Sequence, residues 1–86
     1  MAKALLTPIE QYVVDVVKKK RLEKKYSQKD LAYELEKSVG FIGDVENPKE
    51  RAKYNLNHIN ELAKIFKCSP REFLPEKAIW RMLSGL

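Results

Sequence analysis

Signals that start α-helices recur along the chain, and their short spacing limits what it can fold into. Thr7, Ser27, Ser38, Asn55 and Ser69 are residues of the types that cap helix N-termini, and apolar residues at helical spacing follow each of them. No stretch shows the strict apolar–polar alternation of a half-buried strand. The sequence therefore predicts an all-α domain, a bundle of five short helices.

The first predicted helix is the longest. Thr7 and Glu10 have the spacing of a capping box, and the helix should end near Lys25. Its expected buried stripe comprises Ile9, Val13, Val16, Val17 and Lys20. The cationic residues of its second half should form solvated surface, with Arg21 paired to Glu34 or to another acid of the bundle.

Two short helices with about three residues between them come next. Ser27 and Asp30 form a second capping box, and Ser38 is well placed to cap the following helix. Pro48 blocks continuation of that helix beyond Asn47. The pair of helices is therefore expected within residues 28–47.

Small and apolar residues in this pair predict how the two helices pack. Ala32 lies one turn into the first helix, and Ile42 and Val45 lie three residues apart in the second. A small side chain where two helices cross lets them approach, and the two apolar residues hold the second helix from beneath. This is the geometry of a helix-turn-helix, whose second helix enters a DNA major groove about 12 Å wide.

The last part of the chain predicts one secure helix and one minimal helix. Asn55 caps a strongly periodic segment, and Ser69 to Glu72 repeats the capping pattern before Pro75. The periodic segment carries Leu56, Ile59, Leu62, Ala63 and Phe66 on one face. We expect the core to contain Leu31, Leu35, Ile42, Ile59, Leu62 and Phe66. Residues 1–75 then form the domain, and residues 76–86 form an apolar C-terminal extension.

Three stretches resemble the lambda repressor and Cro-like family of regulators, often called the Xre type. They are residues 27–32 (SQKDLA), 41–47 (FIGDVEN) and 62–70 (LAKIFKCSP). The resemblance covers about residues 17–74 and is specific because the three stretches occur together. It implies a bundle of five helices in which the second and third form the motif and the third contacts DNA.

The resemblance also assigns roles to individual residues. Gln28 matches a glutamine that touches a phosphate, and Ser38 matches a position that contacts the DNA backbone. The groove-facing positions of the third helix are Val39, Gly40, Asp44 and Asn47. The family usually has glycine in the turn, where this chain has Glu36, so either the turn lacks a left-handed residue or Glu36 is mildly strained.

Charge favours a polyanionic partner. The formal net charge is +5, and basic residues flank the third predicted helix at both ends. Lys37, Lys49, Arg51 and Lys53 are the residues that we expect to contact phosphates. Asp44 could accept a hydrogen bond from a cytosine amino group.

Two glycines in the third predicted helix need a reason, because each weakens the helix by up to about 1 kcal/mol relative to alanine. Gly40 and Gly43 would let the backbone approach DNA closely. Alternatively, Gly43 merely relieves crowding against the second helix. The sequence leaves both explanations open.

Catalysis finds no support in the sequence. His58 is the only histidine and Cys68 the only cysteine, and neither has the spacing of a metal site or an activated nucleophile. We therefore expect no enzyme, metal or cofactor. A single cysteine cannot form an intramolecular disulfide, and no apolar run reaches the roughly 18 residues of a membrane span. The expected location is the cytoplasm, with no membrane partner.

The predicted function is sequence-specific binding of double-stranded DNA by a small transcriptional regulator, a repressor. The alternative is a protein-interaction module of the same fold, such as the antitoxin of a toxin–antitoxin pair or a regulator that binds polymerase. The extension is expected to mediate a homodimer, because Ile79, Trp80 and Leu83 recur at helical spacing and are surplus to the core. Trp80 could instead fold back and cover the domain's own core.

Overall fold

The computed structural model describes residues 5–80, and its elements are all helical. In chain order they are α1 (Pro8–Glu23), α2 (Gln28–Leu35), α3 (Val39–Glu46), α4 (Leu56–Phe66) and the 3₁₀ turn η1 (Pro70–Phe73). No strand occurs within this range. No helix there combines the length and the apolar character needed to cross a bilayer.

The helices begin where the capping residues predict. The side chains of Thr7, Ser27, Ser38 and Asn55 each accept a hydrogen bond from the backbone N–H three residues later. Such bonds satisfy donors that the first helical turn leaves without an intrahelical partner. The starts of the four α-helices were therefore predictable from short local patterns, whereas the first helix ends at Glu23, two residues before the predicted Lys25.

The expected count of five α-helices is wrong, because the structure has four α-helices and one 3₁₀ turn. Ser69 caps this turn by accepting a hydrogen bond from the backbone N–H of Arg71. Glu72 forms an ion pair with Lys20 of α1, with Nζ and Oε1 3.0 Å apart, and does not complete a capping box. Four residues with Pro75 close behind leave no room for a full α-helix.

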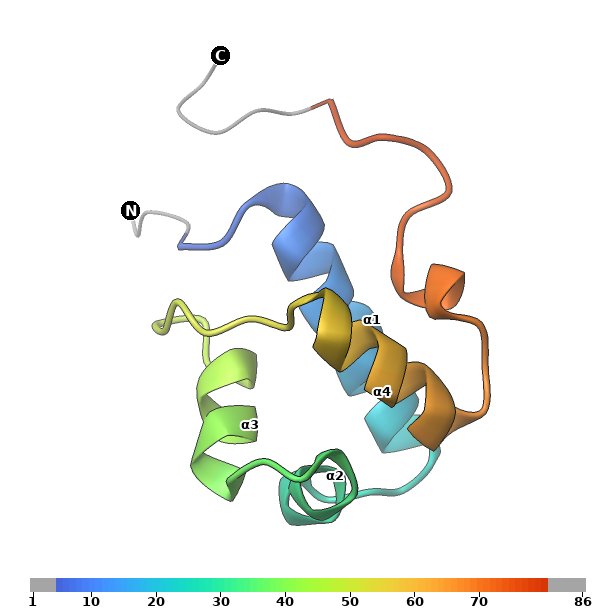
Figure 1. Cartoon of the computed structure of the whole chain (residues 1–86). Coiled ribbons are helices and arrows are strands. Elements are labelled where there is room, and N and C mark those ends of the chain that lie inside the picture. Colours follow the sequence, from blue (N-terminus) through green and yellow to red (C-terminus); the bar gives the residue numbers. More distant parts are fainter. Residues whose placement is uncertain (1–4, 81–86) are drawn as a thin grey trace.

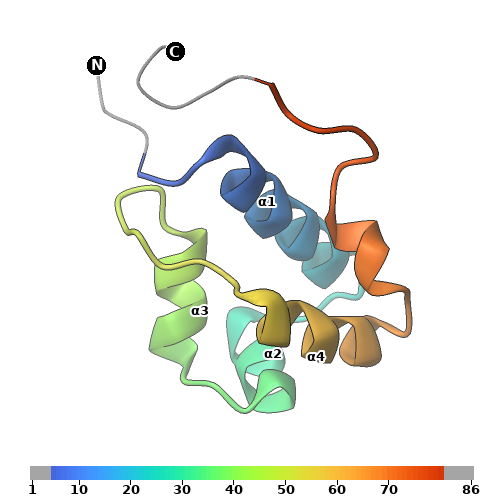
Figure 2. The ribbon, with the colours of Figure 1, turned by 45° about the horizontal axis from the view of Figure 1, so that its top comes forward.

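The helices surround one hydrophobic core. Its buried apolar residues include Val13, Val14, Val17, Leu31, Leu35, Ile42, Val45, Ile59, Leu62 and Phe73. In Figure 1 α4 lies in front of α1, with α2 below them and α3 to the left. In Figures 1 and 2 alike, α3 stands at one edge of the bundle. One side of α3 therefore packs inward and the other is open.

Some of the predicted core is placed differently. Ile9 and Leu56 were expected on buried stripes, yet they are 45% and 79% exposed. Both lie in the first turn of their helices, where the expected stripe extends past the end of the packed bundle. Phe66 is only partly buried against the core. Conversely, Tyr54 is buried although it follows the basic residues Arg51 and Lys53 and was not among the predicted core residues.

The connection between α2 and α3 contains a left-handed residue that is not glycine. Glu36 has φ 58° and ψ 44°, so of the two predicted alternatives the strained Glu36 is confirmed and the turn without a left-handed residue is wrong. The backbone N–H groups of Glu36 and Lys37 donate to the carbonyls of Tyr33 and Ala32 and close the end of α2. The turn thus keeps its shape at the cost of a Cβ in a crowded conformation.

The C-terminal extension shows no helical turn over residues 76–80. Trp80 is 85% exposed, so it does not cover the core, and the intramolecular alternative is wrong for this residue. Figure 1 shows the chain after η1 running away from the bundle. Leu83, the third residue of the expected apolar stripe, lies outside the described residues.

Candidate nucleic-acid interface

Helices α2 and α3 form the helix-turn-helix that the sequence predicts. They pack against each other more extensively than any other pair of elements. Ala32 is only 2% exposed, and Ile42 and Val45 are buried on the inner side of α3. Because three-residue spacing puts Ile42 and Val45 on one face, the opposite face of α3 projects outward.

A buried ion pair fixes the C-terminal end of α3 to α1. The Arg21 guanidinium donates through Nε and Nη2 to the two carboxylate oxygens of Glu46, both at 2.9 Å. The two side chains are only 8% and 4% exposed. Arg21 Nη1 also donates to the Tyr26 carbonyl at 2.7 Å. The partner of Arg21 is therefore another acid of the bundle and not Glu34.

Gln28 extends this network toward the outer surface. Its Nε2 donates to Glu46 Oε1 at 3.0 Å, and the side chain is half-buried. An amide nitrogen carries two hydrogens, so one remains to donate to a phosphate. The predicted phosphate contact is thus compatible with this hydrogen bond, and Glu46 orients the amide.

Three rings hold the N-terminal half of α3 against the start of α4. The centroid of Phe41 lies 6.1 Å from that of Tyr54 and 5.2 Å from that of His58. His58 Nδ1 also accepts a hydrogen bond from the Asn55 backbone N–H at 3.0 Å, which completes a capping box. Burial, and then the positive charge of Lys37, lowers the pKa of the imidazole.

Tyr54 packs close to the buried ion pair. Its hydroxyl is buried and has no hydrogen-bond partner among residues 5–80. Burial raises the pKa of the phenol, and the nearby Glu46 carboxylate adds to this effect. Tyr54 therefore stays neutral and acts as a packing residue beneath α3.

The outward face of α3 holds the predicted groove-facing residues. Val39, Gly40, Asp44 and Asn47 are all exposed, and Gly43 between them is half-buried. Ser38 is also exposed, and its Oγ accepts the Phe41 backbone N–H at 3.0 Å. The Ser38 hydroxyl proton is still available to donate, so capping and a phosphate contact are compatible.

Asn47 is only partly available for a base. Its Oδ1 accepts the backbone N–H of Lys49 at 2.9 Å in the turn after α3. Bidentate pairing with adenine uses both the oxygen and the nitrogen of an asparagine side chain. Asn47 therefore offers its amide nitrogen as a donor unless this turn rearranges.

The four predicted phosphate contacts differ in their surroundings. Lys37 precedes α3, and its Nζ lies 5.9 Å from the centroid of the Phe41 ring. Lys49 and Arg51 follow α3, are exposed and form no ion pair within residues 5–80. Lys53 differs because its Nζ lies 3.3 Å from Glu10 Oε2. Lys37, Lys49 and Arg51 are thus the freer cations around α3.

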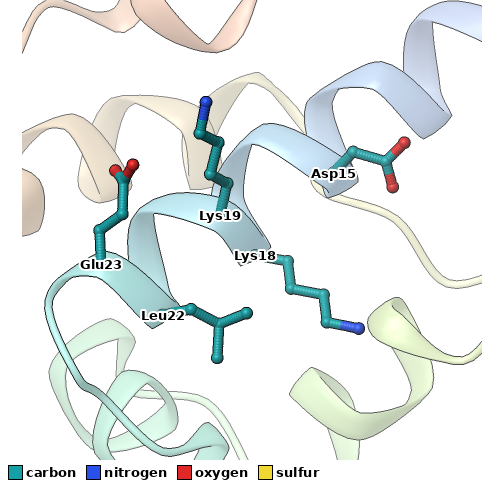
Figure 3. Close-up of a pocket in the computed structure, with 5 residues that line it drawn as sticks. All are labelled: Asp15, Lys18, Lys19, Leu22 and Glu23. Atoms are coloured by element: carbon teal, nitrogen blue, oxygen red, sulfur yellow. The ribbon is translucent and has the colours of Figure 1, made fainter.

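The cationic half of α1 does not form a comparable surface. An open hollow on this helix is lined by Asp15, Lys18, Lys19, Leu22 and Glu23, all of which project from α1 (Figure 3). Two acids among these residues offset the two lysines. Lys20 pairs with Glu72, and Lys24 stacks over the Tyr26 ring. These contacts agree with the interpretation of this run as a solvated face.

Comparison with known proteins rests on structure. No protein-family model matches the chain, and no curated protein matches it. The crystal structure of the restriction-modification controller protein C.AhdI from Aeromonas hydrophila is similar, with a TM-score of 0.63 and 25% sequence identity. The match covers 73% of this chain and 92% of that one. The chain thus shares the small all-helical fold of C.AhdI.

A second solved structure, apo-HppE, shares the fold alone. It has a TM-score of 0.65 and 19% identity, and the match covers 78% of this chain. Only 36% of the HppE chain is covered. The likeness therefore concerns one part of that protein.

Sequence reasoning missed several residues that position the interface. The Arg21–Glu46 pair joins residues 25 positions apart, so no local pattern reveals it. The role of His58 in capping α4 was detectable, because it stands three residues after Asn55. Tyr54 was missed because its neighbours are polar and basic.

Proposed function

We propose that the chain is a small helix-turn-helix regulator that binds double-stranded DNA through the outward face of α3. The observation that carries the proposal is the position of this face between free cations. The fold fixes α3 from its inner side, and Lys37 precedes it while Lys49 and Arg51 follow it. Such an arrangement suits a helix lying in a groove with phosphates at both ends.

The similarity to C.AhdI supports a regulatory role, because that protein is a restriction-modification controller. We propose repression of transcription from a specific site as the biological role, with the protein in the cytoplasm. An enzymatic role is not part of the proposal. The cations at both ends of α3 favour DNA over a toxin or polymerase, because a protein partner would not need them.

Fluorescence anisotropy with a randomised duplex pool tests DNA binding directly. The full chain should bind at low salt, and the affinity should fall with a log–log slope of about −0.9 for each phosphate neutralised. Lys37, Lys49 and Arg51 are expected to contribute most to the slope. Absence of binding to any duplex at low salt would contradict the proposal.

Two groups of variants separate phosphate contacts from base contacts. Lys49→Ala and Arg51→Ala should weaken binding to all sequences alike and should flatten the salt dependence. Asp44→Ala and Asn47→Ala should change which sequence a selection experiment returns. An unchanged preferred sequence for Asp44→Ala would remove this residue from the base-contacting set.

We also propose that the active form is a homodimer that uses the C-terminal extension. Supporting this, Trp80 is 85% exposed and has no role in the domain core. A two-fold pair would place two copies of α3 about one DNA turn, roughly 34 Å, apart on an inverted repeat. Sedimentation of the full chain and of a chain ending at Glu76 tests the proposal. The full chain should sediment as a dimer, and the shortened chain should sediment as a folded monomer.

A further inference from the structure

Two glycines, Gly40 and Gly43, lie on the outward face of α3. Successive helical residues are rotated by about 100°. Across an arc of about 140° the order of residues is therefore Val39, Gly43, Asn47, Gly40 and Asp44. Val39 marks one border of this arc, and bare backbone at Gly43 and Gly40 lies beside it. A large flat ligand can approach the helix closely at this point.

The fold itself does not require either glycine. A Cβ at Gly40 would lie 3.9 Å from Ser38 Oγ, and one at Gly43 would lie 3.5 Å from Gln28 Oε1. Both are ordinary van der Waals distances, so crowding against α2 does not explain Gly43. Alanine would fit and would favour the helix by up to about 1 kcal/mol at each position. The missing side chains make sense if something outside the domain needs the space.

Val39 gives this surface its chemistry. It is the first residue of α3, it is 47% exposed, and its side chain can neither donate nor accept a hydrogen bond. The N-terminal residues of a helix in this position contact base edges. In the major groove guanine, adenine and cytosine present hydrogen-bonding groups, whereas thymine adds an apolar C5-methyl group. An isopropyl side chain matches the methyl group.

Resting on the DNA-binding function proposed above, we infer that α3 recognises the C5-methyl group of a pyrimidine through Val39. Gly40 and Gly43 allow the backbone to come near enough for this contact. The cations at the two ends of α3 complement the phosphates on either side of such a base. In unmodified DNA the methyl group is that of thymine, and in modified DNA 5-methylcytosine presents the same group.

Base analogues test this recognition in the full chain. After selection of a preferred duplex, each thymine is replaced in turn by deoxyuridine, which lacks only the methyl group. One or two replacements should weaken binding about three- to fivefold, the effect of losing one buried methyl group. At the same position, a 5-methylcytosine–guanine pair should bind more tightly than a cytosine–guanine pair. The two comparisons together show whether the protein recognises the methyl group itself or the geometry of an A·T pair.

Variants then assign the contact to Val39. Val39→Ala should bind more weakly and should lose the difference between thymine and deoxyuridine. Leu22→Ala removes another exposed apolar side chain, on α1, and should keep that difference. Gly43→Ala should melt at a higher temperature and yet bind the preferred duplex on the order of tenfold more weakly, because its methyl group would overpack the interface.

The outcomes separate this inference from the proposed function. Equal binding of all deoxyuridine duplexes by a protein that does bind DNA would overturn the inference alone. A deoxyuridine effect that survives in Val39→Ala would overturn the assignment to this residue. Failure of the parent chain to bind any duplex would overturn both.

Discussion

The two faces of α3 are built by opposite means. The inner face is fixed by Ile42 and Val45 in the core, by the Phe41 ring and by the buried Glu46–Arg21 pair. The outer face carries two glycines, one valine and few polar groups. Stability is therefore concentrated on the inner side, and the outer side is left free for recognition. Substitutions on the two faces should therefore change the free energy of unfolding by different amounts and in opposite directions.

The largest effect is expected for Glu46→Ala. Removing one partner leaves the Arg21 guanidinium buried without its carboxylate, which costs about 3 to 5 kcal/mol of the free energy of unfolding. It also releases the C-terminal end of α3 and the Gln28 amide. Urea unfolding followed by circular dichroism measures the loss.

The Lys20–Glu72 pair provides the matched control, because its Glu72 side chain is 51% exposed. Glu72→Gln should unfold at nearly the same urea concentration as the parent, since exposed pairs contribute little. Similar losses for Glu46→Ala and Glu72→Gln would show that burial does not distinguish the two pairs.

A smaller loss is expected where α2 crosses α3. Ala32→Leu adds three carbon atoms at a site that is only 2% exposed, so overpacking should cost about 1 to 3 kcal/mol. Ala32→Gly is the useful companion, because it loses helix propensity without overpacking. Thermal melts that match the parent for Ala32→Leu would show that this crossing is looser than described.

Substitutions on the outer face should stabilise the domain instead of destabilising it. Gly40→Ala and Gly43→Ala should each raise the free energy of unfolding, by up to about 1 kcal/mol, because a Cβ fits in the isolated domain. Differential scanning calorimetry without DNA measures the gain. A lower melting temperature for either variant would mean that the packing of α3 against the domain leaves no room for a Cβ at that position.

The smallest effect concerns pH. The pKa of His58 is lowered below its ordinary value of 6.5 by burial and by Lys37. The unfolded chain then binds a proton more readily than the folded one. The stability contributed by neutral His58 is therefore complete above about pH 6.5 and declines as the pH falls through the lowered pKa.

Protonation also removes the Nδ1 acceptor from the cap of α4. In His58→Gln the loss of stability between pH 7.5 and pH 5 should be smaller than in the parent. Equal losses in the two proteins would assign the pH dependence to other groups.

A feature of this fold can be predicted from the sequence when the residues that create it are close together in the chain. Caps such as Ser27 with Asp30 act over three residues, so the starts of the four α-helices could be predicted. The resemblance left two alternatives open for Glu36, and only the folded turn shows that its backbone is left-handed. The Arg21–Glu46 pair and the buried Tyr54 depend on contacts across the bundle, which no local pattern contains.

The predicted interface residues divide in the same way. The resemblance implied that Val39, Gly40, Asp44 and Asn47 lie on the open face, and all four are exposed in the folded chain. The side-chain hydrogen bond that occupies Asn47 Oδ1 and the ion pair of Lys53 depend on how the following loop folds. That loop has no periodic pattern from which these contacts could be predicted.

The exposed position of Trp80 determines what an optical experiment on this protein would observe. It is the only tryptophan of the chain and lies on the extension, outside the packed helices. Its emission in the monomer should resemble that of indole in water, and melting of the bundle should change it little. A blue shift with rising protein concentration would instead report burial of the extension. Intrinsic fluorescence therefore measures self-association, whereas unfolding has to be followed by a signal from the helical backbone, such as circular dichroism.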